Sequence, residues 1–364
     1  MQPKTTLWPL ESHTKGKHLV LKNYLNAWFP ILGQTHQRIL IIDGFAGPGQ
    51  YEKGEDGSPM IALKTLATHR AKDQIKSEVV FLFIEQDKNR AEFLENLINS
   101  SNLCIPSSCS VRVINSKFDD TMTQALDQLD RQAKRLAPSF VMVDPFGVSG
   151  TPMTVIRRIL RNPKSEVYIS LMYEYINRFV ATPEFENNLD NLFGTTLWRN
   201  ALNIVNPIDR KMYLYGLYED QLRQAGAKNV IHFELYEGQR LVYAIFFGTQ
   251  STIGCNCMKQ AIWKVAPFGN YKFYSTHIGQ LPLSDDFTDF TVLKQGLRNC
   301  FSRNVWVRIE DVKDFVSSDR TDFHTGHLKM KALVSMEAEG LIEVDENTRK
   351  RKRTFPDGTK LRFL

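Results

Sequence analysis

The chain has 364 residues, of which 42% are hydrophobic and 24% are charged, and its formal net charge is +6. This composition is that of an ordinary globular protein with room for two or three domains, and it excludes a disordered or fibrous chain. The first residues lack the apolar core of a signal peptide, and no later apolar run approaches roughly 18 residues, so the sequence predicts a soluble, cytoplasmic protein.

Five apolar, β-branched runs recur along the first half of the chain, at 38–44, 78–87, 110–115, 139–147 and 166–174. The segments between them have helical periodicity, because their apolar residues return every three or four positions. Strands that alternate with helices in this way predict an α/β fold, in which a parallel sheet carries helices on both faces.

Two further runs, at 230–238 and 240–249, are separated by a short turn and predict a β-hairpin. Five parallel strands that end in an antiparallel hairpin are typical of the Rossmann-like, seven-stranded sheet of class I methyltransferases, whereas nicotinamide-binding sheets close with a sixth parallel strand. We therefore predict a methyltransferase-like domain over residues 1–300. A helical insertion at 175–228 lies where a lid over the ligand crevice is expected.

The last segment, 301–364, predicts a separate winged-helix module. Its sequence indicates a helix at 307–318, a second helix capped by Thr325, and two strands around a turn. The turn is rich in Lys and Arg, including Arg351 and Arg353, which favours contacts with the phosphates of DNA or RNA. A protein contact, or a solvated edge that blocks sheet pairing, remains the alternative.

The five cysteines are an odd number spread over a long chain, which argues against a disulfide framework. Cys255 and Cys257 are one residue closer together than the usual zinc pair, and His324 and His327 form only a lone pair. We predict free thiols and no metal site.

The first strand ends in an acidic residue and breaks into a glycine-rich loop, IIDGFAGPGQ at 41–50. The third glycine of a dinucleotide fingerprint is absent, and Asp43 would repel a pyrophosphate. S-adenosylmethionine has no phosphate and carries an ammonium and a sulfonium, both of which a carboxylate attracts. Gly47 and Gly49 let the backbone approach this ligand closely, and Phe45 and Ala46 keep the approach apolar. The loop therefore predicts an S-adenosylmethionine site.

Two more strand ends offer acidic groups for the nucleoside part of the same cofactor. Glu85 ends the second strand and is placed to accept both ribose hydroxyls. Asp119 follows the third strand, where the adenine amino group is expected. A helix-capping role fits Asp87 better than Glu85.

The fourth strand ends in Asp144, Pro145 and Phe146, at the position where the methyl group would be presented. Enzymes that methylate an exocyclic amine place Asp or Asn, then Pro, then a third residue and often an aromatic here, so that the amine is held and the base is stacked. In this chain the third residue is Phe146 and Gly147 follows it, so the stacking geometry departs from the Asp-Pro-Pro-Tyr form. The motif predicts a catalytic site that acts mainly by positioning.

Two other clusters are candidates for binding the substrate. Lys17 and His18 precede the first strand, on a helix expected to fold over the cofactor mouth. Glu174, Asn177 and Arg178 follow the fifth strand and are expected at the same cleft. A role as ordinary surface residues is the alternative for both clusters.

The chain resembles the three-Cys-motif partner protein family, TcmP. The resemblance rests on seven segments, which are KHLVLKNYLNAWFPIL, IDGFAGPGQY with GSPMIAL, FIEQD, VDPFG, LMYEYINRF, MKQAIWKV and HTGHLKMKALVSMEAEGLI. It implies a class I methyltransferase fold that binds S-adenosylmethionine through Asp43, Gly47, Gly49 and Glu85, with Asp144 at the reaction site. It also implies a neighbouring partner protein with three cysteines that resembles radical S-adenosylmethionine enzymes.

The sequence thus predicts an S-adenosylmethionine-dependent methyltransferase that acts on a nitrogen of a nucleic-acid base. Two alternatives remain. In the first alternative, the chain is a non-catalytic accessory partner of the three-cysteine protein. In the second, it methylates a small molecule or a peptide.

Overall fold

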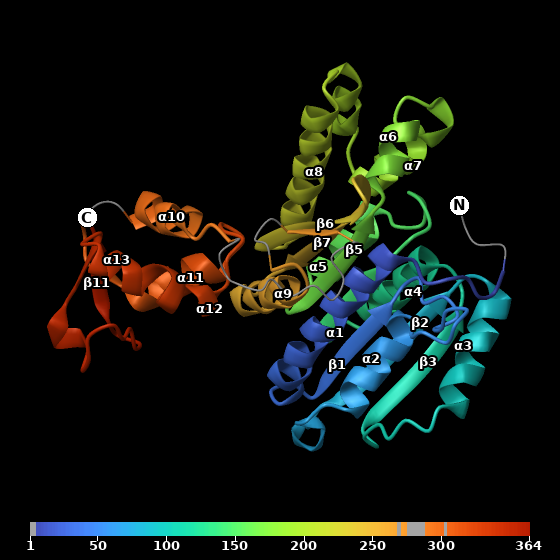
Figure 1. The fold of residues 1–364 in the computed structure, drawn as a ribbon. Coiled ribbons are helices and arrows are strands. Elements are labelled where there is room, and N and C mark those ends of the chain that lie inside the picture. The colour runs from blue at the N-terminus through green and yellow to red at the C-terminus, as the bar shows by residue number, and fades with distance from the viewer. Residues whose placement is uncertain (1–4, 268–270, 275–287, 302–303) are drawn as a thin grey trace. The chain divides into compact units, whose positions relative to one another are not determined.

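The computed structural model describes residues 5–267, 271–274, 288–301 and 304–364 (Figure 1). They fall into two compact units, one from the ranges 1–251 and 273–278 and the other from 252–272 and 279–364. The second unit therefore begins before the predicted boundary at residue 301. No helix in the described ranges is long and apolar enough to cross a membrane. None of the five cysteines, all of which lie in the described ranges, is part of a disulfide.

The first unit is built on a mixed sheet whose strands match the predicted runs closely. The strands are β1 (Arg38–Asp43), β2 (Glu78–Glu85), β3 (Cys109–Asn115), β4 (Ser139–Val143), β5 (Ser165–Leu171), β6 (Asn229–Glu237) and β7 (Arg240–Thr249). β4 and β5 end three or four residues before their predicted ends. Asp144 therefore lies in the loop after β4.

The strand order confirms a mostly parallel sheet that closes with an antiparallel hairpin. The order is β3-β2-β1-β4-β5-β7-β6-β8, and the first five strands pair in parallel. β7 is antiparallel to both β5 and β6. The described residues give this sheet eight strands rather than the seven predicted, because a short β8 (Lys272–Tyr274) is added at the edge beside β6.

The two faces of the sheet bury different side chains because neighbouring residues on a strand point to opposite sides. Val141 and Val143 belong to one apolar core with α4 (Phe118–Arg131), α5 (Met153–Leu160) and α8 (Pro207–Gln224). Phe140 points to the other face and contacts Tyr24 of α1 (Ser12–Gly33), with ring centroids 5.2 Å apart. Two further helices are α2 (Ser58–Ala67), which packs against α1, and α3 (Lys88–Ser100), which contacts β2 and β3.

A buried carboxylate fixes α1 against the sheet. Glu166 on β5 is 4% exposed and accepts hydrogen bonds from the Tyr24 hydroxyl at 2.6 Å and the Trp28 indole at 2.9 Å. It also accepts one from the Thr249 hydroxyl of β7 at 2.6 Å. Because each donor is buried with it, this network holds α1 in one position on β5 and β7. It thereby fixes the start of α1, which carries Lys17 and His18.

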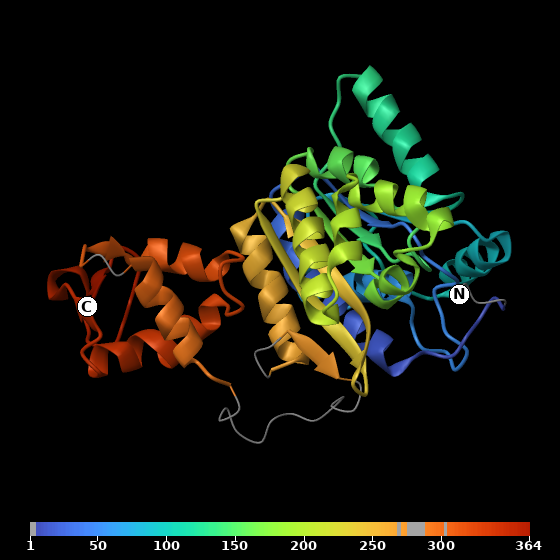
Figure 2. The ribbon, with the colours of Figure 1, turned by 90° about the horizontal axis from the view of Figure 1, so that it is seen from above.

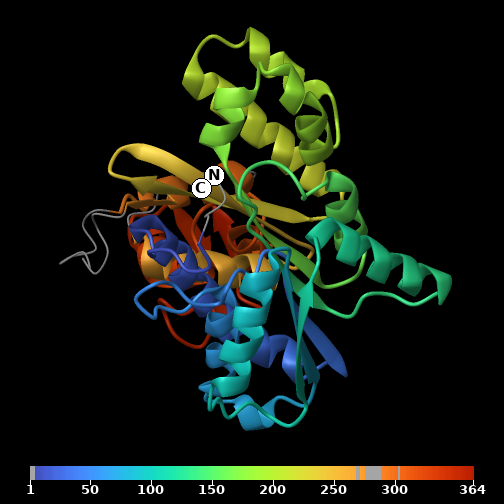
Figure 3. The same ribbon diagram turned by 90° about the vertical axis from the view of Figure 1, so that its right-hand side faces the viewer.

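The segment 175–228 is largely helical, as predicted. It holds α6 (Tyr173–Phe179), α7 (Glu186–Phe193), a 3₁₀ turn at Leu197–Asn203 and α8. These helices, green to yellow in Figure 3, extend beyond one end of the sheet. Trp198, fully buried, anchors them by donating to Asp190 at 2.7 Å.

The second unit is drawn in orange to red in Figure 2. Its helices are α9 (Thr252–Val265), α10 (Thr291–Phe301), α11 (Ile309–Ser317), α12 (Thr325–His327) and α13 (Val334–Ala338), the last two joined by a π-helical stretch, Leu328–Leu333. Its strands β9 (Val307–Arg308), β10 (Ile342–Val344) and β11 (Lys360–Phe363) form a sheet in the order β10-β11-β9.

Buried Lys259 explains why α9 groups with the C-terminal elements. Its ammonium donates to the backbone carbonyls of Val316, Ser318 and Thr321 at 2.5, 2.6 and 2.9 Å, which closes the end of α11. One predicted detail of this unit is wrong, because His324 and not Thr325 caps the second helix. The His324 ring accepts from the backbone N–H of Gly326, and Thr325 is the first helical residue.

Candidate functional site

The loop after β1 contains two glycines with positive φ, and the carboxylate at the end of β1 is buried beside it. Gly47 and Gly49 have φ values of +60° and +76°, which favour glycine strongly. Asp43 is 1% exposed, and its Oδ1 accepts from the Phe45 N–H at 3.2 Å. Its Oδ2 is buried and accepts no hydrogen bond from the described residues. Burial raises the pKa of Asp43 to about 6, although the nearby Ser58 hydroxyl and the Phe45 amide act in the opposite direction.

The carboxylate at the end of β2 supports the same loop. Glu85 accepts from the Gly47 N–H with one oxygen and from the Asp87 N–H with the other, each at 2.8 Å. Each oxygen keeps a second lone pair for a further donor. Asp87 caps α3 by accepting from the Arg90 N–H, as predicted.

Two adjoining cavities open where β1, β2 and β4 end. The first, which we call the acidic cavity, has a volume of about 280 Å³ and is lined by Glu85, Asp119, Phe118 and Lys117. The Oδ1 atom of Asp119 is buried there without a partner among the described residues. The loop residues Phe45 and Phe146 line both cavities.

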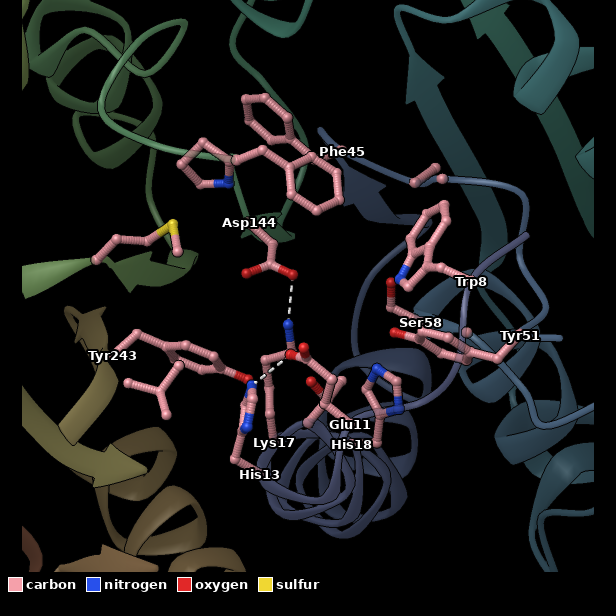
Figure 4. Close-up of a pocket in the computed structure, with 18 of the residues that line it drawn as sticks. Trp8, Glu11, His13, Lys17, His18, Phe45, Tyr51, Ser58, Asp144 and Tyr243 are labelled. Atoms are coloured by element: carbon pink, nitrogen blue, oxygen red, sulfur yellow. Dashed lines mark hydrogen bonds and ion pairs between the residues drawn. The ribbon is translucent and has the colours of Figure 1, made fainter. Parts of the chain in front are cut away.

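The second, which we call the aromatic cavity, has a volume of about 370 Å³ (Figure 4). Its walls carry rings from several elements, namely Trp8, Phe45, Tyr51, Phe146, Tyr175 and Tyr243. Trp8 makes edge-to-face contacts with Tyr51 and with Phe146, at centroid distances of 5.9 Å in both cases. Phe146 is 44% exposed, which is unusual for a large apolar ring. Aromatic rings at a cavity wall suit a flat aromatic ligand.

The start of α1 lines the aromatic cavity with charged and polar groups. The Lys17 ammonium donates to Asp144 Oδ2 (Figure 4), and the side chains of Lys17 and Asp144 are 9% and 42% exposed. Burial opposes ionisation of both groups, but their mutual attraction outweighs it. The pKa of Lys17 is therefore raised, and the pKa of Asp144 is lowered.

His18 lies next to this ion pair and is neutral. Burial, together with the neighbouring Lys17 ammonium, lowers the pKa of His18 to about 3. Its ring lies 5.8 Å from that of Tyr51. His18 can therefore donate or accept a hydrogen bond at neutral pH but adds no charge.

The structure brings most of the predicted site residues to the two cavities. Asp144, Pro145, Phe146, Lys17, His18, Phe45, Ala46, Gly47 and Gly49 line the aromatic cavity, and Glu85 and Asp119 line the acidic cavity. Asp43 lies beside both members of the Lys17–Asp144 pair, in a small cavity that they share.

The cluster after β5 is not brought to the cavities. Glu174 pairs at 2.7 Å with Arg240, which itself lines the aromatic cavity. Asn177 accepts from Arg210 at 3.0 Å within the helical insertion, and Arg178 lies over the ring of Phe179. From the insertion it is Tyr175 that reaches the cavity wall, because helical spacing turns it to a different side from its neighbours.

Several lining residues escaped sequence reasoning. Tyr51 directly follows the glycine loop and could have been found from that position. Trp8 could not, because the segment before α1 has no periodic pattern. Its backbone carbonyl accepts from the Glu52 N–H at 3.0 Å, and the guanidinium of buried Arg90 lies 5.1 Å from its ring centroid. Tyr243 reaches the cavity through the β6–β7 hairpin, whose inward face cannot be read from the sequence.

No family model matches the chain, and no curated protein matches it. The resemblance to the three-Cys-motif partner family therefore stays a prediction. Solved structures that overlap part of the chain include the human methyltransferase 10 domain containing protein, at 14% identity and a TM-score of 0.32 over 64% of this chain and 83% of that one. The METTL16 methyltransferase domain overlaps at 14% identity and a TM-score of 0.31, over 63% and 65%.

A Legionella pneumophila protein overlaps at 12% identity and a TM-score of 0.35, over 64% of this chain and 84% of that one. Overlaps of this extent carry no argument about activity.

Proposed function

We propose that this protein is a class I methyltransferase that binds S-adenosylmethionine and methylates a nitrogen of a nucleic-acid base. The observation that carries the proposal is the buried Asp43 carboxylate at the end of β1. Its Oδ2 accepts no hydrogen bond from the described residues, and the loop that follows it contains two glycines with positive φ. A buried acceptor without a donor is costly, and a cationic ligand with N–H groups would relieve that cost. The sheet order and its antiparallel β7 are those expected of this enzyme class.

The residues of both cavities fit the parts of S-adenosylmethionine. Glu85 keeps lone pairs for two ribose hydroxyls, and Oδ1 of Asp119, which has no partner among the described residues, suits the amino group of an adenine. Phe45 and Ala46 would contact the ligand between these groups and Asp43. When bound, the cofactor supplies an electrophilic methyl group on a sulfonium.

The protein itself contributes positioning and charge. Asp144 and the backbone of Pro145 lie at the wall of the aromatic cavity, and Phe146 with Trp8 and Tyr51 would hold a flat base there. Most of the rate enhancement in such a site comes from orientation of the acceptor lone pair toward the methyl carbon.

The second unit supports a nucleic-acid partner. We propose that β9 to β11 with α11 to α13 form a winged helix that binds DNA or RNA. Five exposed cations would contact phosphates, and they are Lys350, Arg351, Lys352, Arg353 and Lys360. Two other arginines of this segment do not fit that role. Arg349 is 8% exposed and binds Glu337 and Glu346, while Arg362 pairs with Glu343.

The primary test is calorimetric titration with S-adenosylmethionine. Wild-type protein should bind with a Kd of roughly micromolar order, near −8 kcal/mol. Asp43→Asn should abolish binding, because it keeps the side-chain shape but removes the charge that attracts the ammonium. Exposed Asp73→Asn is the matched control and should bind like the wild type. No binding to the wild-type protein would refute the proposal.

Nucleic-acid binding has its own test. Replacing Lys350, Arg351, Lys352 and Arg353 with Ser should weaken binding to a DNA or RNA oligonucleotide. The slope of log K against log salt should flatten by roughly 0.9 per lost contact on duplex DNA and by less on a single strand. Lys313→Ser is the control, because its ammonium pairs with Asp357 at 2.5 Å. An unchanged slope in the fourfold variant would argue for a protein contact.

One observation favours the second candidate, a non-catalytic accessory partner of a three-cysteine protein related to radical S-adenosylmethionine enzymes. The Lys17 ammonium already occupies Oδ2 of Asp144 and shares the negative charge that would otherwise stabilise an acceptor amine. Co-purification with such a protein, together with no transfer of labelled methyl to DNA or RNA, would support this candidate instead.

A further inference from the structure

The Lys17–Asp144 pair presents a hydrogen-bond donor beside an acceptor at the wall of the aromatic cavity. Within the described part of the chain the Lys17 ammonium makes one hydrogen bond, to Asp144 Oδ2. An ammonium has three N–H donors, so two of them remain for a ligand. The Asp144 side chain is 42% exposed, and although the Ser170 hydroxyl beside it helps to lower its pKa, the carboxylate has lone pairs for a further donor. A ligand edge that matches this pair needs a donor next to an acceptor.

Lys17 is held in place as a permanent cation. Its side chain is 9% exposed, and the Tyr168 hydroxyl donates to its backbone carbonyl at 3.2 Å. The nitrogen lies 5.3 Å from the ring centroid of Tyr243, which stabilises a positive charge. The contact with Asp144 also raises the pKa of the ammonium. Displacing Lys17 to admit an amine would separate a buried ion pair, which is strongly unfavourable.

A fixed ammonium also disfavours an amino acceptor electrostatically. Methylation of an exocyclic amine develops positive charge on its nitrogen, close to Lys17, and the negative charge of Asp144 is already shared with that ammonium. An acceptor that becomes an anion during the reaction is favoured instead, because the Lys17 ammonium stabilises its negative charge.

On the basis of the proposed methyl transfer, we propose that the acceptor is a lactam edge, in which a ring N–H stands beside a carbonyl, as in guanine, uracil or thymine. The ring N–H donates to Asp144, and the carbonyl oxygen accepts from Lys17. The aromatic cavity holds the ring between Trp8, Tyr51 and Phe146. Lys17 is then the residue that determines which edge of a base is recognised.

The reaction that follows is balanced without a further reactant. The ring N–H passes its proton to the Asp144 carboxylate and on to solvent, while the charge left on the lactam oxygen is stabilised by Lys17. The ring nitrogen forms the new N–C bond with its electron pair. The C–S bond of a bound donor would break, and its electrons would remain on sulfur as a neutral thioether.

The test measures nucleoside binding in the absence of cofactor, by calorimetry. Guanosine or uridine should bind roughly tenfold or more tightly than adenosine and cytidine, since a matched pair of hydrogen bonds discriminates by about that factor. Lys17→Met should lose the preference, whereas Lys17→Arg should keep part of it. Lys15→Met is the matched control, because Lys15 is exposed on the same helix and should behave like the wild type.

Three results would overturn the lactam assignment. They are equal or tighter binding of adenosine and cytidine, a preference that survives in Lys17→Met, and no nucleoside binding at all. The wild-type comparison decides the question even if a variant fails to fold. S-adenosylmethionine binding combined with an amino preference would refute the lactam edge and leave the methyltransferase standing. Lactam binding without any S-adenosylmethionine binding would refute the methyltransferase instead.

Discussion

Two neighbouring strand ends in this protein carry aspartates with opposite electrostatics. Asp43 ends β1 and Asp144 follows β4, which pairs with β1 in parallel. Asp43 is buried, no ion pair joins it to another described residue, and its pKa rises to about 6. Asp144 binds the Lys17 ammonium, and its pKa falls below the ordinary value. A buried carboxylate with no bound cation attracts a cationic ligand strongly. A carboxylate that is already paired attracts it less, because the partner cation neutralises most of its charge.

The largest expected effect on stability comes from removing Asp144 alone. Asp144→Ala leaves the Lys17 ammonium buried without its counter-ion, which should lower the free energy of unfolding by about 3 kcal/mol. This is the lower end of the usual range, since Asp144 is partly exposed. The double variant Lys17→Met with Asp144→Ala should recover part of the loss. Urea denaturation of the two single variants and the double variant measures this coupling, and additive effects would mean that the ion pair contributes nothing.

Removing the charge of Asp43 should have the opposite effect on the free energy of unfolding. Because its folded pKa of about 6 lies above the ordinary value of 3.8, the folded state holds the proton more tightly than the unfolded state. The associated stability is present below about pH 4 and is lost as the pH rises through about 6. Asp43→Asn should therefore stabilise the ligand-free protein by about 1–3 kcal/mol at pH 8. The difference from the wild type should shrink toward pH 4 in thermal melts. A destabilised Asp43→Asn at pH 8 would mean that the carboxylate has a partner in the free protein.

The smallest effect is expected at His18, whose side chain carries no charge at neutral pH. Its pKa of about 3 keeps it neutral throughout the physiological range. His18→Gln should therefore leave the pH dependence of cofactor binding between pH 5 and 8 unchanged, because no charge is removed. Calorimetry at several pH values checks this. A binding step near pH 6 that disappears in His18→Gln would show that His18, rather than Asp43, titrates there.

The sequence by itself determined the sheet and the acidic strand ends. Periodicity and β-branched runs fixed the seven strands to within a few residues, because buried parallel strands must be continuously apolar. The same reasoning placed Asp43, Glu85 and Asp144 at one edge, since parallel strands share their carboxyl ends. The glycine-rich loop after the first strand was also predicted from the sequence, because backbone positions with positive φ favour glycine.

Only the tertiary structure decided which charges are paired. Arg349 and Arg351 are two residues apart in one basic run, yet Arg349 is buried against two glutamates and Arg351 is exposed. Lys17 and Asp144 are 127 positions apart, and no local pattern in the chain records that they meet. Their contact depends on how α1 packs on β5 and β7 through Glu166. Pairing sets the charge that a ligand meets. The sheet and its acidic strand ends therefore follow from local sequence, whereas the charge presented by the Lys17–Asp144 pair follows from packing.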